Sequence, residues 1–197
     1  VFLELSSWEG EAHGLSRING NSAKSEANPT AVRPGALKNG QRYRVLVEVR
    51  TEQDRAAINV RLDEKQLIAW SGGFDQIEPN LAFRTDSNTR LALASGNPSA
   101  VFHSLTVEQL PRGEKPSSKP AASITAGQPI DLTAINWSQR KGDIGVVEFQ
   151  GQQVIRTQGK DDTVAFLPEV ELGDGTLEVE IASDIFSGIA LRGADTD

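Results

Sequence analysis

The sequence predicts an all-β protein, a sandwich of antiparallel strands with low helix content. Polar and apolar residues alternate along several segments, which is the pattern of half-buried strands. Turn signals such as Asn-Gly and Gly-Gly separate these segments at short intervals. No window of about twelve residues has apolar positions at a helical repeat. Short strands joined by frequent turns favour a β-sandwich or jelly roll.

Four segments carry the alternation most clearly. The apolar face of each is expected to contain Tyr43, Val45, Val47 and Val49; Ile58, Val60 and Leu62; Val101, His103, Leu105 and Val107; and Leu177, Val179 and Ile181. The second segment is expected to begin a hairpin with Asp63-Glu64-Lys65 at its tip. Short strands are expected near Leu15–Ile18 and Thr30–Val32.

The stretch from Pro111 to Pro129 interrupts the alternation. It contains four of the nine prolines, with Ser, Ala and Lys between them, and it has no apolar face. This composition is typical of a linker. We therefore predict strands in residues 1–110, a linker in 111–129 and strands in 130–197, with the two strand regions together forming one sandwich.

Composition restricts the function classes. The net charge is -7 at pH 7, which argues against a nucleic-acid partner because phosphate contacts need clustered Lys and Arg. The absence of Cys excludes disulfides and thiol nucleophiles. No apolar run approaches the roughly 18 residues of a membrane-spanning helix. The chain contains no Met, so we expect it to be a piece of a longer protein.

The region after the linker contains "NW" at Asn136-Trp137, a "VEFQG" strand, "DGTLEVEI" at Asp174–Ile181 and "GIALR" at Gly188–Arg192. It resembles the first half of a concanavalin A-like jelly roll, and most of all the bacterial 3-keto-disaccharide hydrolase domain and laminin-G-like domains. The region before the linker, with "VFLELSS" and "LKNGQRYRVLVEVR", resembles the second half. The resemblance thus implies two complementary halves in circularly permuted order.

Two explanations of this order compete. The chain could span the end of one jelly roll and the beginning of the next in a tandem array. Alternatively, the two pieces complete a single sandwich, which avoids exposed strand edges and an exposed apolar face. In that case Ile185–Arg192 pairs with Val1–Ser6. A strand-swapped dimer is the nearest rival to a monomer.

Glu178 and Glu180 are the first candidate site residues, because they share one face of a predicted strand and paired carboxylates serve glycosidases. The related laminarinase-type glucanases carry Glu-x-Asp-x-x-Glu on one strand. Here Glu180 stands in place of the Asp and Ser183 in place of the second Glu, which puts that mechanism in doubt. A solvated acidic face explains the same residues. Arg192 could grip a sugar hydroxyl or a carboxylate, or pair with these glutamates.

Trp8 is the candidate aromatic platform for a sugar, because it lies in a predicted loop. Trp70 and Trp137 are expected in the core, and His103 is expected to face inward. No metal site is predicted from the two histidines. Structural calcium bound by the carboxylates of "KDD", "GDG" or "GADTD" is a hypothesis beside the simpler interpretation as turn residues.

Three hypotheses about function follow. The first is a non-catalytic glycan-recognition or adhesion module of a larger exported bacterial protein, extracellular, periplasmic or in the cell envelope. Its partner is a carbohydrate or another protein, without nucleic acid or membrane. The second is a hydrolase of the 3-keto-disaccharide type, with Glu178 or Glu180 as base. The third is a structural spacer domain.

Overall fold

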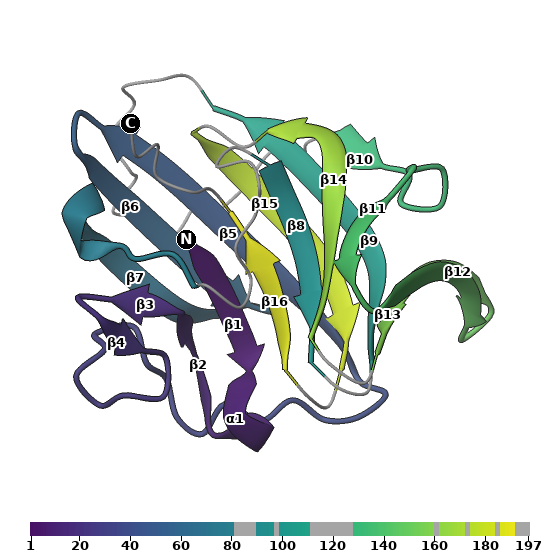
Figure 1. Ribbon diagram of the computed structural model, residues 1–197, viewed down its shortest axis with the longest axis horizontal. Coiled ribbons are helices and arrows are strands. Elements are labelled where there is room, and N and C mark those ends of the chain that lie inside the picture. The colour runs from purple at the N-terminus through teal and green to yellow at the C-terminus, as the bar shows by residue number, and fades with distance from the viewer. Residues whose placement is uncertain are drawn as a thin grey trace.

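The computed structural model describes residues 1–80, 90–96, 99–110, 128–159, 162–171, 174–183 and 186–191. Nearly all regular structure within them is β-strand. The strands form two antiparallel sheets that pack face to face as a sandwich. Figure 1 shows the six-stranded sheet in front of the eight-stranded sheet. The predicted all-β fold is therefore confirmed.

The six-stranded sheet contains strands from both ends of the chain. From one edge to the other its order is β11 (Ser138–Lys141), β14 (Thr163–Glu171), β8 (Arg90–Ser95), β16 (Ser187–Ala190), β1 (Phe2–Ser6) and β2 (Ala12–Leu15). The eight-stranded sheet has the order β12 (Asp143–Phe149), β13 (Gln152–Gln158), β9 (Ser99–Gln109), β15 (Gly175–Ala182), β5 (Arg42–Glu52), β6 (Arg55–Leu62) and β7 (Lys65–Gly73). Its eighth strand, β10 (Gln128–Ile130), also pairs with β9.

The turns agree with the sequence signals in part. The Gly-Gly signal at Gly72 and Gly73 does not mark a turn, because both residues belong to β7. Leu62 pairs with Lys65, so the predicted hairpin between β6 and β7 turns at Asp63 and Glu64. The expected strand near Leu15–Ile18 is divided between β2 and the two-residue β3 (Arg17–Ile18), which pairs with β4 (Asn21–Ser22). At the expected strand Thr30–Val32, Val32 makes only an isolated bridge to His13.

Both sheets join strands that lie on either side of the predicted linker. The ladder between β1 and β16 pairs Phe2 with Ala190 and Leu5 with Ser187, as predicted for the two ends of the chain. In the other sheet β15 lies between β5 and β9. Residues 111–127 of the predicted linker lie outside the described residues, and β10 begins at Gln128. The sandwich is therefore one structure built from both regions.

One apolar core lies between the sheets, and the alternation explains it. The predicted inward faces of β5, β6 and β15 are buried in it or packed against it, as is Trp70 on β7, and Trp137 packs against its surface. The six-stranded sheet contributes chiefly leucines and one isoleucine, namely Leu3, Leu5, Leu15, Leu91, Leu93, Leu167 and Ile189. Because this core draws on both sheets, apolar burial stabilises their face-to-face packing.

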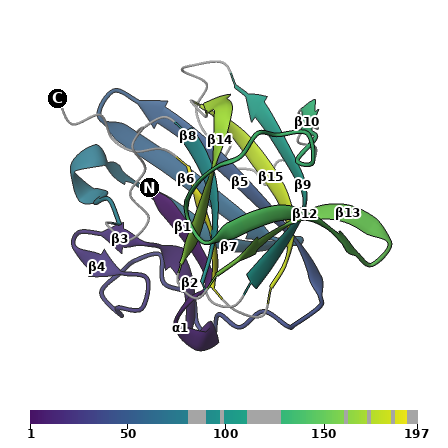
Figure 2. The ribbon, with the colours of Figure 1, turned by 45° about the vertical axis from the view of Figure 1, so that its right-hand side comes forward.

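The prediction that Val101, His103, Leu105 and Val107 share one face of β9 is wrong. The register between β9 and β15 shifts between Glu180 and Ile181, which leaves His103 as an extra residue on β9. This bulge puts Phe102 and Leu105 into the core, while Val101 belongs to a separate apolar cluster with Val154. His103 therefore lies outside the core, against Phe149 of the β12–β13 hairpin that projects from the sandwich in Figure 2.

Candidate functional site

Glu4 is a buried carboxyl on the outer face of the six-stranded sheet. Leu3 and Leu5, its neighbours along β1, belong to the core, so the Glu4 side chain lies on the opposite face. Its partners on the adjacent strands are two glycines, Gly188 on β16 and Gly14 on β2. Although neither glycine has a side chain to cover it, Glu4 is only 5% exposed. More distant parts of the chain must therefore cover it.

The cover occupies the space above the two glycines. A Cβ atom on Gly188 would lie 2.3 Å from Cε1 of Phe2. A Cβ atom on Gly14 would lie 3.0 Å from Cβ of Ala23. The phenylalanine ring and the segment after β4 can approach the sheet this closely only because both positions are glycine.

The surroundings of Glu4 favour its protonated form. Burial is the main cause that raises the pKa of Glu4 to about 7, and the Asp162 carboxylate adds to the effect. Hydrogen bonds from Ser7 and Asn80 oppose it, and Asn80 Nδ2 donates to Glu4 Oε1 at 3.3 Å. Near neutral pH Glu4 therefore populates both protonation states, so it can donate or accept a hydrogen bond.

Backbone contacts bring Asn80 to this carboxyl. The segment after the short helix η1 (Phe74–Gln76) is tied to the β3–β4 hairpin, because the Asn19 N–H donates to the Gln76 carbonyl at 2.8 Å. The Glu78 N–H donates to the Arg17 carbonyl at 3.2 Å. An ion pair between Arg17 Nε and Glu78 Oε2, also at 3.2 Å, supports the same contact.

A strained turn presents Trp8. The four-residue element α1 (Ser7–Gly10) has left-handed backbone at its start and in its interior rather than regular helical geometry. The left-handed residues are Ser6 (φ 51°), Trp8 (φ 55°), Glu9 (φ 58°) and Gly10 (φ 82°). Each non-glycine residue in this region costs about 1–2 kcal/mol. The Gly35 N–H holds the turn by donating to the Gly10 carbonyl at 3.0 Å, and the Leu37 N–H donates to the Ser6 hydroxyl at 3.3 Å.

Trp8 is half exposed, with 52% of its surface accessible. Lys24 Nζ lies 5.5 Å from the centroid of its ring, in cation–π geometry, and also pairs with Glu11 at 2.9 Å. Strained backbone of this kind clusters at ligand-binding sites, and here it holds a large aromatic ring open to solvent. The predicted platform residue is therefore placed where a ligand could reach it.

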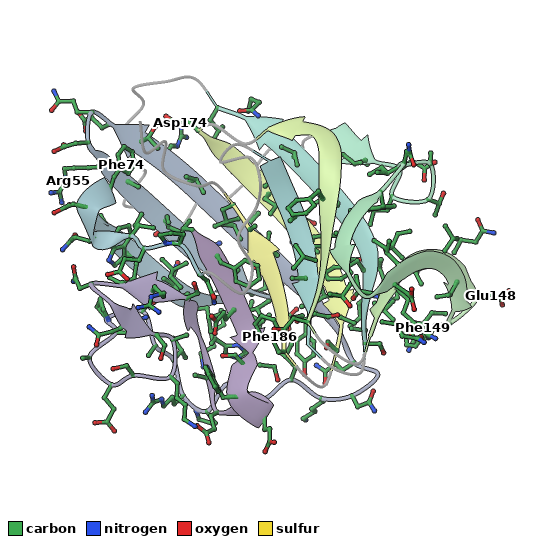
Figure 3. All side chains as sticks on the ribbon, in the orientation of Figure 1. Arg55, Phe74, Glu148, Phe149, Asp174 and Phe186 are labelled. Carbon is green, nitrogen blue, oxygen red and sulfur yellow. The ribbon has the colours of Figure 1, made fainter. Side chains whose placement is uncertain are left out.

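These groups line one cleft of about 480 Å³, which we call the Glu4 cleft. Its walls come from four segments far apart in the sequence, and they are formed by Glu4, Ser7, Trp8, Ser16, Arg17, Ser22, Asn80, Asp162 and Phe186. Figure 3 shows Phe186 beside β1, where its ring stacks with Phe2 at a centroid distance of 6.0 Å. A cleft of this size, with two aromatic rings and several convergent polar groups, fits a small-molecule site.

Ser16 adds an unsatisfied hydroxyl to the cleft. It is 1% exposed, and its Oγ makes no hydrogen bond to any part of the chain that the structure describes. A buried hydroxyl without a partner costs free energy, so such groups are uncommon in folded proteins. A bound ligand in the cleft could supply the missing partner.

The structure places the predicted glutamates on the opposite face of the sandwich from Trp8. Leu177 and Val179 enter the core, so Glu178 and Glu180 lie on the outer face of the eight-stranded sheet. Arg44 Nη2 donates to Glu178 Oε2 at 2.7 Å, which raises the pKa of Arg44, and Arg42 Nη1 lies 3.6 Å from Glu180 Oε2. These cross-strand ion pairs agree with the interpretation as a solvated charged face.

The sequence also singles out Arg192 and His103, of which the structure describes only His103, and His103 does not line the cleft. Arg192 lies outside the residues that the structure describes. His103 makes no hydrogen bond within the described residues, and burial, with a smaller effect from Arg42, lowers its pKa. Its ring lies edge-on to Phe149 at 5.6 Å. His103 is thus an apolar-packed histidine on the outer face, not the inward-facing core residue that the alternation predicts.

Among the described residues no group of three or more His, Asp or Glu side chains could hold a metal ion. Of the carboxylates considered for calcium, Asp174 is buried, and its Oδ1 accepts hydrogen bonds from the Thr51 N–H at 2.9 Å and the Thr51 hydroxyl at 2.5 Å. Asp174 thereby connects the turn that precedes β15 to strand β5. Residues 160–161 and 193–197, which hold the other carboxylates apart from Asp162, lie outside the described residues.

Sequence reasoning missed Glu4, Ser16 and Asn80. The signal for Glu4 is the "VFLELSS" segment, where one acidic residue interrupts an apolar strand between two leucines. A charge at such a position is rarely buried without a specific reason. Ser16 and Asn80 carry no comparable signal, because only the folded chain brings them near β1.

No protein-family model matches the chain, and no curated protein is significantly similar to it. Within the described residues, no helix has the length and apolar character needed to cross a lipid bilayer.

Proposed function

We propose that this chain is a carbohydrate-recognition module and that the sugar binds in the Glu4 cleft. The observation that carries the proposal is the half-exposed Trp8 ring at a cleft that also contains the buried carboxyl of Glu4. Sugars offer flat apolar faces to aromatic rings and hydroxyls to polar groups. The cleft offers both kinds of surface, whereas Glu178 and Glu180 are engaged in ion pairs.

The fold hypothesis belongs to the same proposal. We infer a concanavalin A-like jelly roll in circularly permuted order, related to the 3-keto-disaccharide hydrolase domain and to laminin-G-like domains. The ladder between β1 and β16 supports this order, because it joins the strands that the resemblance puts side by side. The module would act as a monomer or strand-swapped dimer in a larger exported protein of the cell envelope, extracellular or periplasmic.

Binding to a glycan array, followed by calorimetric titration of the best ligand, tests the proposal. Trp8→Ala should weaken binding about tenfold or more, since loss of a central aromatic contact commonly costs over 1 kcal/mol. Glu178→Gln is the matched control on the opposite face and should leave affinity unchanged. An array without any bound glycan, or equal effects of the two substitutions, would contradict the proposal.

A second candidate function is glycoside processing in the same cleft. It is favoured by Glu4, whose raised pKa of about 7 is the property of a general acid, together with Asp162 as a second carboxyl in the cleft. Turnover of a 3-keto-glucoside that is abolished by Glu4→Gln and retained by Glu178→Gln would establish it. Turnover lost only in Glu178→Gln would instead support the base suggested by the resemblance.

A further inference from the structure

Among the described residues, two carboxyl groups and one basic side chain line the Glu4 cleft. Glu4 and Asp162 contribute carboxyl groups from two distant segments, and the Asp162 carboxylate is close enough to raise the pKa of Glu4. Arg17 is the one basic side chain among the described residues that line the cleft. Its guanidinium is already paired, because Nε lies 3.2 Å from Glu78 Oε2 and Nη2 donates to the Gly20 carbonyl at 3.4 Å.

The rest of the cleft is suited to an ammonium group on a sugar. Lys24 Nζ lies 5.5 Å from the centroid of the Trp8 ring, so this ring already has one cation in cation–π geometry beside it. The buried Ser16 hydroxyl lines the cleft and makes no hydrogen bond within the described residues, so its oxygen can accept one from a ligand N–H or O–H. This hydroxyl is an observation independent of the two carboxyls.

We propose that the Glu4 cleft binds a sugar with a free amine, such as an oligosaccharide of glucosamine, with the ammonium group held by Glu4 and Asp162. The proposal rests on the carbohydrate-binding function proposed above and adds the class of sugar. Charge-assisted hydrogen bonds from an ammonium to carboxylates are stronger than those from a neutral hydroxyl. Glu4 populates both protonation states near neutral pH, and a neighbouring ammonium favours its ionised form. The cleft should therefore prefer the free amine over both an N-acetyl group and a hydroxyl at the same position.

Calorimetric titration of the full chain with three β-1,4-linked tetrasaccharides tests this preference. The probes are the tetramers of glucosamine, N-acetylglucosamine and glucose, at about pH 6.5, which lies below the pKa of about 7.7–8.0 of an amine beside an electron-withdrawing group. We expect the glucosamine tetramer to bind about tenfold more tightly than either of the other two. Acetylation is the decisive comparison, because it removes the charge and keeps the sugar ring.

Two variants locate the preference in the cleft. Glu4→Gln and Asp162→Asn should each reduce the affinity ratio between the glucosamine and glucose tetramers to about threefold or less. Glu178→Gln removes the same charge from the opposite face, so it should keep the wild-type ratio. This control separates recognition in the cleft from general attraction of a polyamine to a chain of net charge -7.

The outcomes distinguish the two proposals. If the wild-type chain binds the neutral tetramers as tightly as the glucosamine tetramer, and Trp8→Ala weakens that binding, the amine preference is wrong and carbohydrate recognition stands. An amine preference that Glu178→Gln reduces as much as Glu4→Gln also overturns the inference. If none of the tetramers binds and the glycan array is also blank, carbohydrate recognition itself fails.

Discussion

The Phe2 ring lies directly over Gly188, with Cε1 and Cζ 2.3 Å and 2.4 Å from the place where a Cβ atom would stand. Gly188 is also the cross-strand partner of Glu4. One glycine therefore serves two purposes: it lets the aromatic ring pack on the outer face of the sheet, and it keeps the carboxyl of Glu4 free of a neighbouring side chain.

This relationship predicts that Gly188→Ala destabilises the fold by about 1–3 kcal/mol, the usual cost of overpacking. Chemical denaturation monitored by tryptophan fluorescence measures the change. The loss should shrink when Phe2 is also replaced by Ala, because the clash is then largely removed. Gly145→Ala on β12 is the control, since a Cβ atom there meets nothing within 4 Å. Equal effects of the two Gly→Ala substitutions would contradict the packing of Phe2.

Glu4 and His13 should oppose each other in the pH dependence of stability. The pKa of Glu4 rises from 4.5 to about 7 on folding. Its contribution to the free energy of unfolding is therefore full below pH 4.5 and is lost as the pH rises to about 7, because the buried carboxyl must then ionise. Burial lowers the pKa of His13 from 6.5 to about 4. Its contribution to the free energy of unfolding is therefore full above pH 6.5 and is lost as the pH falls to about 4, because the buried imidazole must then become charged. Each effect amounts to about 3 kcal/mol.

Denaturation of the wild type and two variants across this range measures the effect. Relative to the wild type, Glu4→Gln should gain stability as pH rises from 4.5 to 6.5, and His13→Asn should lose it. Asp162 and Arg17, the charged groups that share the cleft, remain in both variants and therefore cancel in the comparison. Parallel profiles for all three proteins would mean that neither group is perturbed as described.

The strained turn at Trp8 predicts a stabilising substitution. Glu9 is exposed and has φ of 58°, a conformation that glycine adopts without the steric cost of a Cβ atom. Glu9→Gly should therefore raise the free energy of unfolding by about 0.5–1 kcal/mol, after the entropy cost of glycine is subtracted. Glu11→Gly removes the same charge where φ is -70°, together with an exposed ion pair to Lys24 that contributes about 1 kcal/mol or less, so it should destabilise instead. The reverse order of the two melting temperatures would exclude strain at Glu9.

The shared sheets predict that the two regions of the chain bind each other when separated. Residues 1–110 and 128–197, expressed as two chains, should copurify as one complex, because strands from both regions pair in each sheet. Leu5→Asp in the first chain should abolish the complex, since Leu5 is fully buried in the shared core. Val146→Asp at an exposed position of the second chain is the control.

Light scattering of the intact chain completes this test. A mass near 21.2 kDa indicates pairing within one chain, and twice that mass indicates a strand-swapped dimer. Two separated regions that each fold alone and do not associate would refute the shared sandwich.

Local patterns were sufficient to predict much of the fold. Alternation identified the inward faces of β5, β6 and β15, because one-sided burial makes each strand follow a period of two. It failed at His103, where one extra residue in β9 reverses the side on which the following residues lie. A bulge depends on the partner strand, so the sequence of β9 alone does not reveal it.

The candidate site was predictable only in part. Trp8 could be found because it lies in a loop and is one of three tryptophans. Glu4 is a candidate because Asn80, Asp162 and Phe186 line the same cleft, and these residues are separated from it by 76 or more positions in the sequence. Such distant contacts follow from the order of the strands in the sheets, which residue patterns do not specify.

The position of β9 also bears on how the chain is made. Its neighbours β10, β13 and β15 all follow residue 127, and so do both neighbours of β8. When β8 and β9 have been synthesised, none of the described strands that pair with them has yet been made. Both edges of β8 are paired only after β16 (Ser187–Ala190) has been synthesised. Unpaired edges are prone to association with other chains. We therefore expect the chain to fold slowly, because this strand order depends on contacts between residues far apart in the sequence.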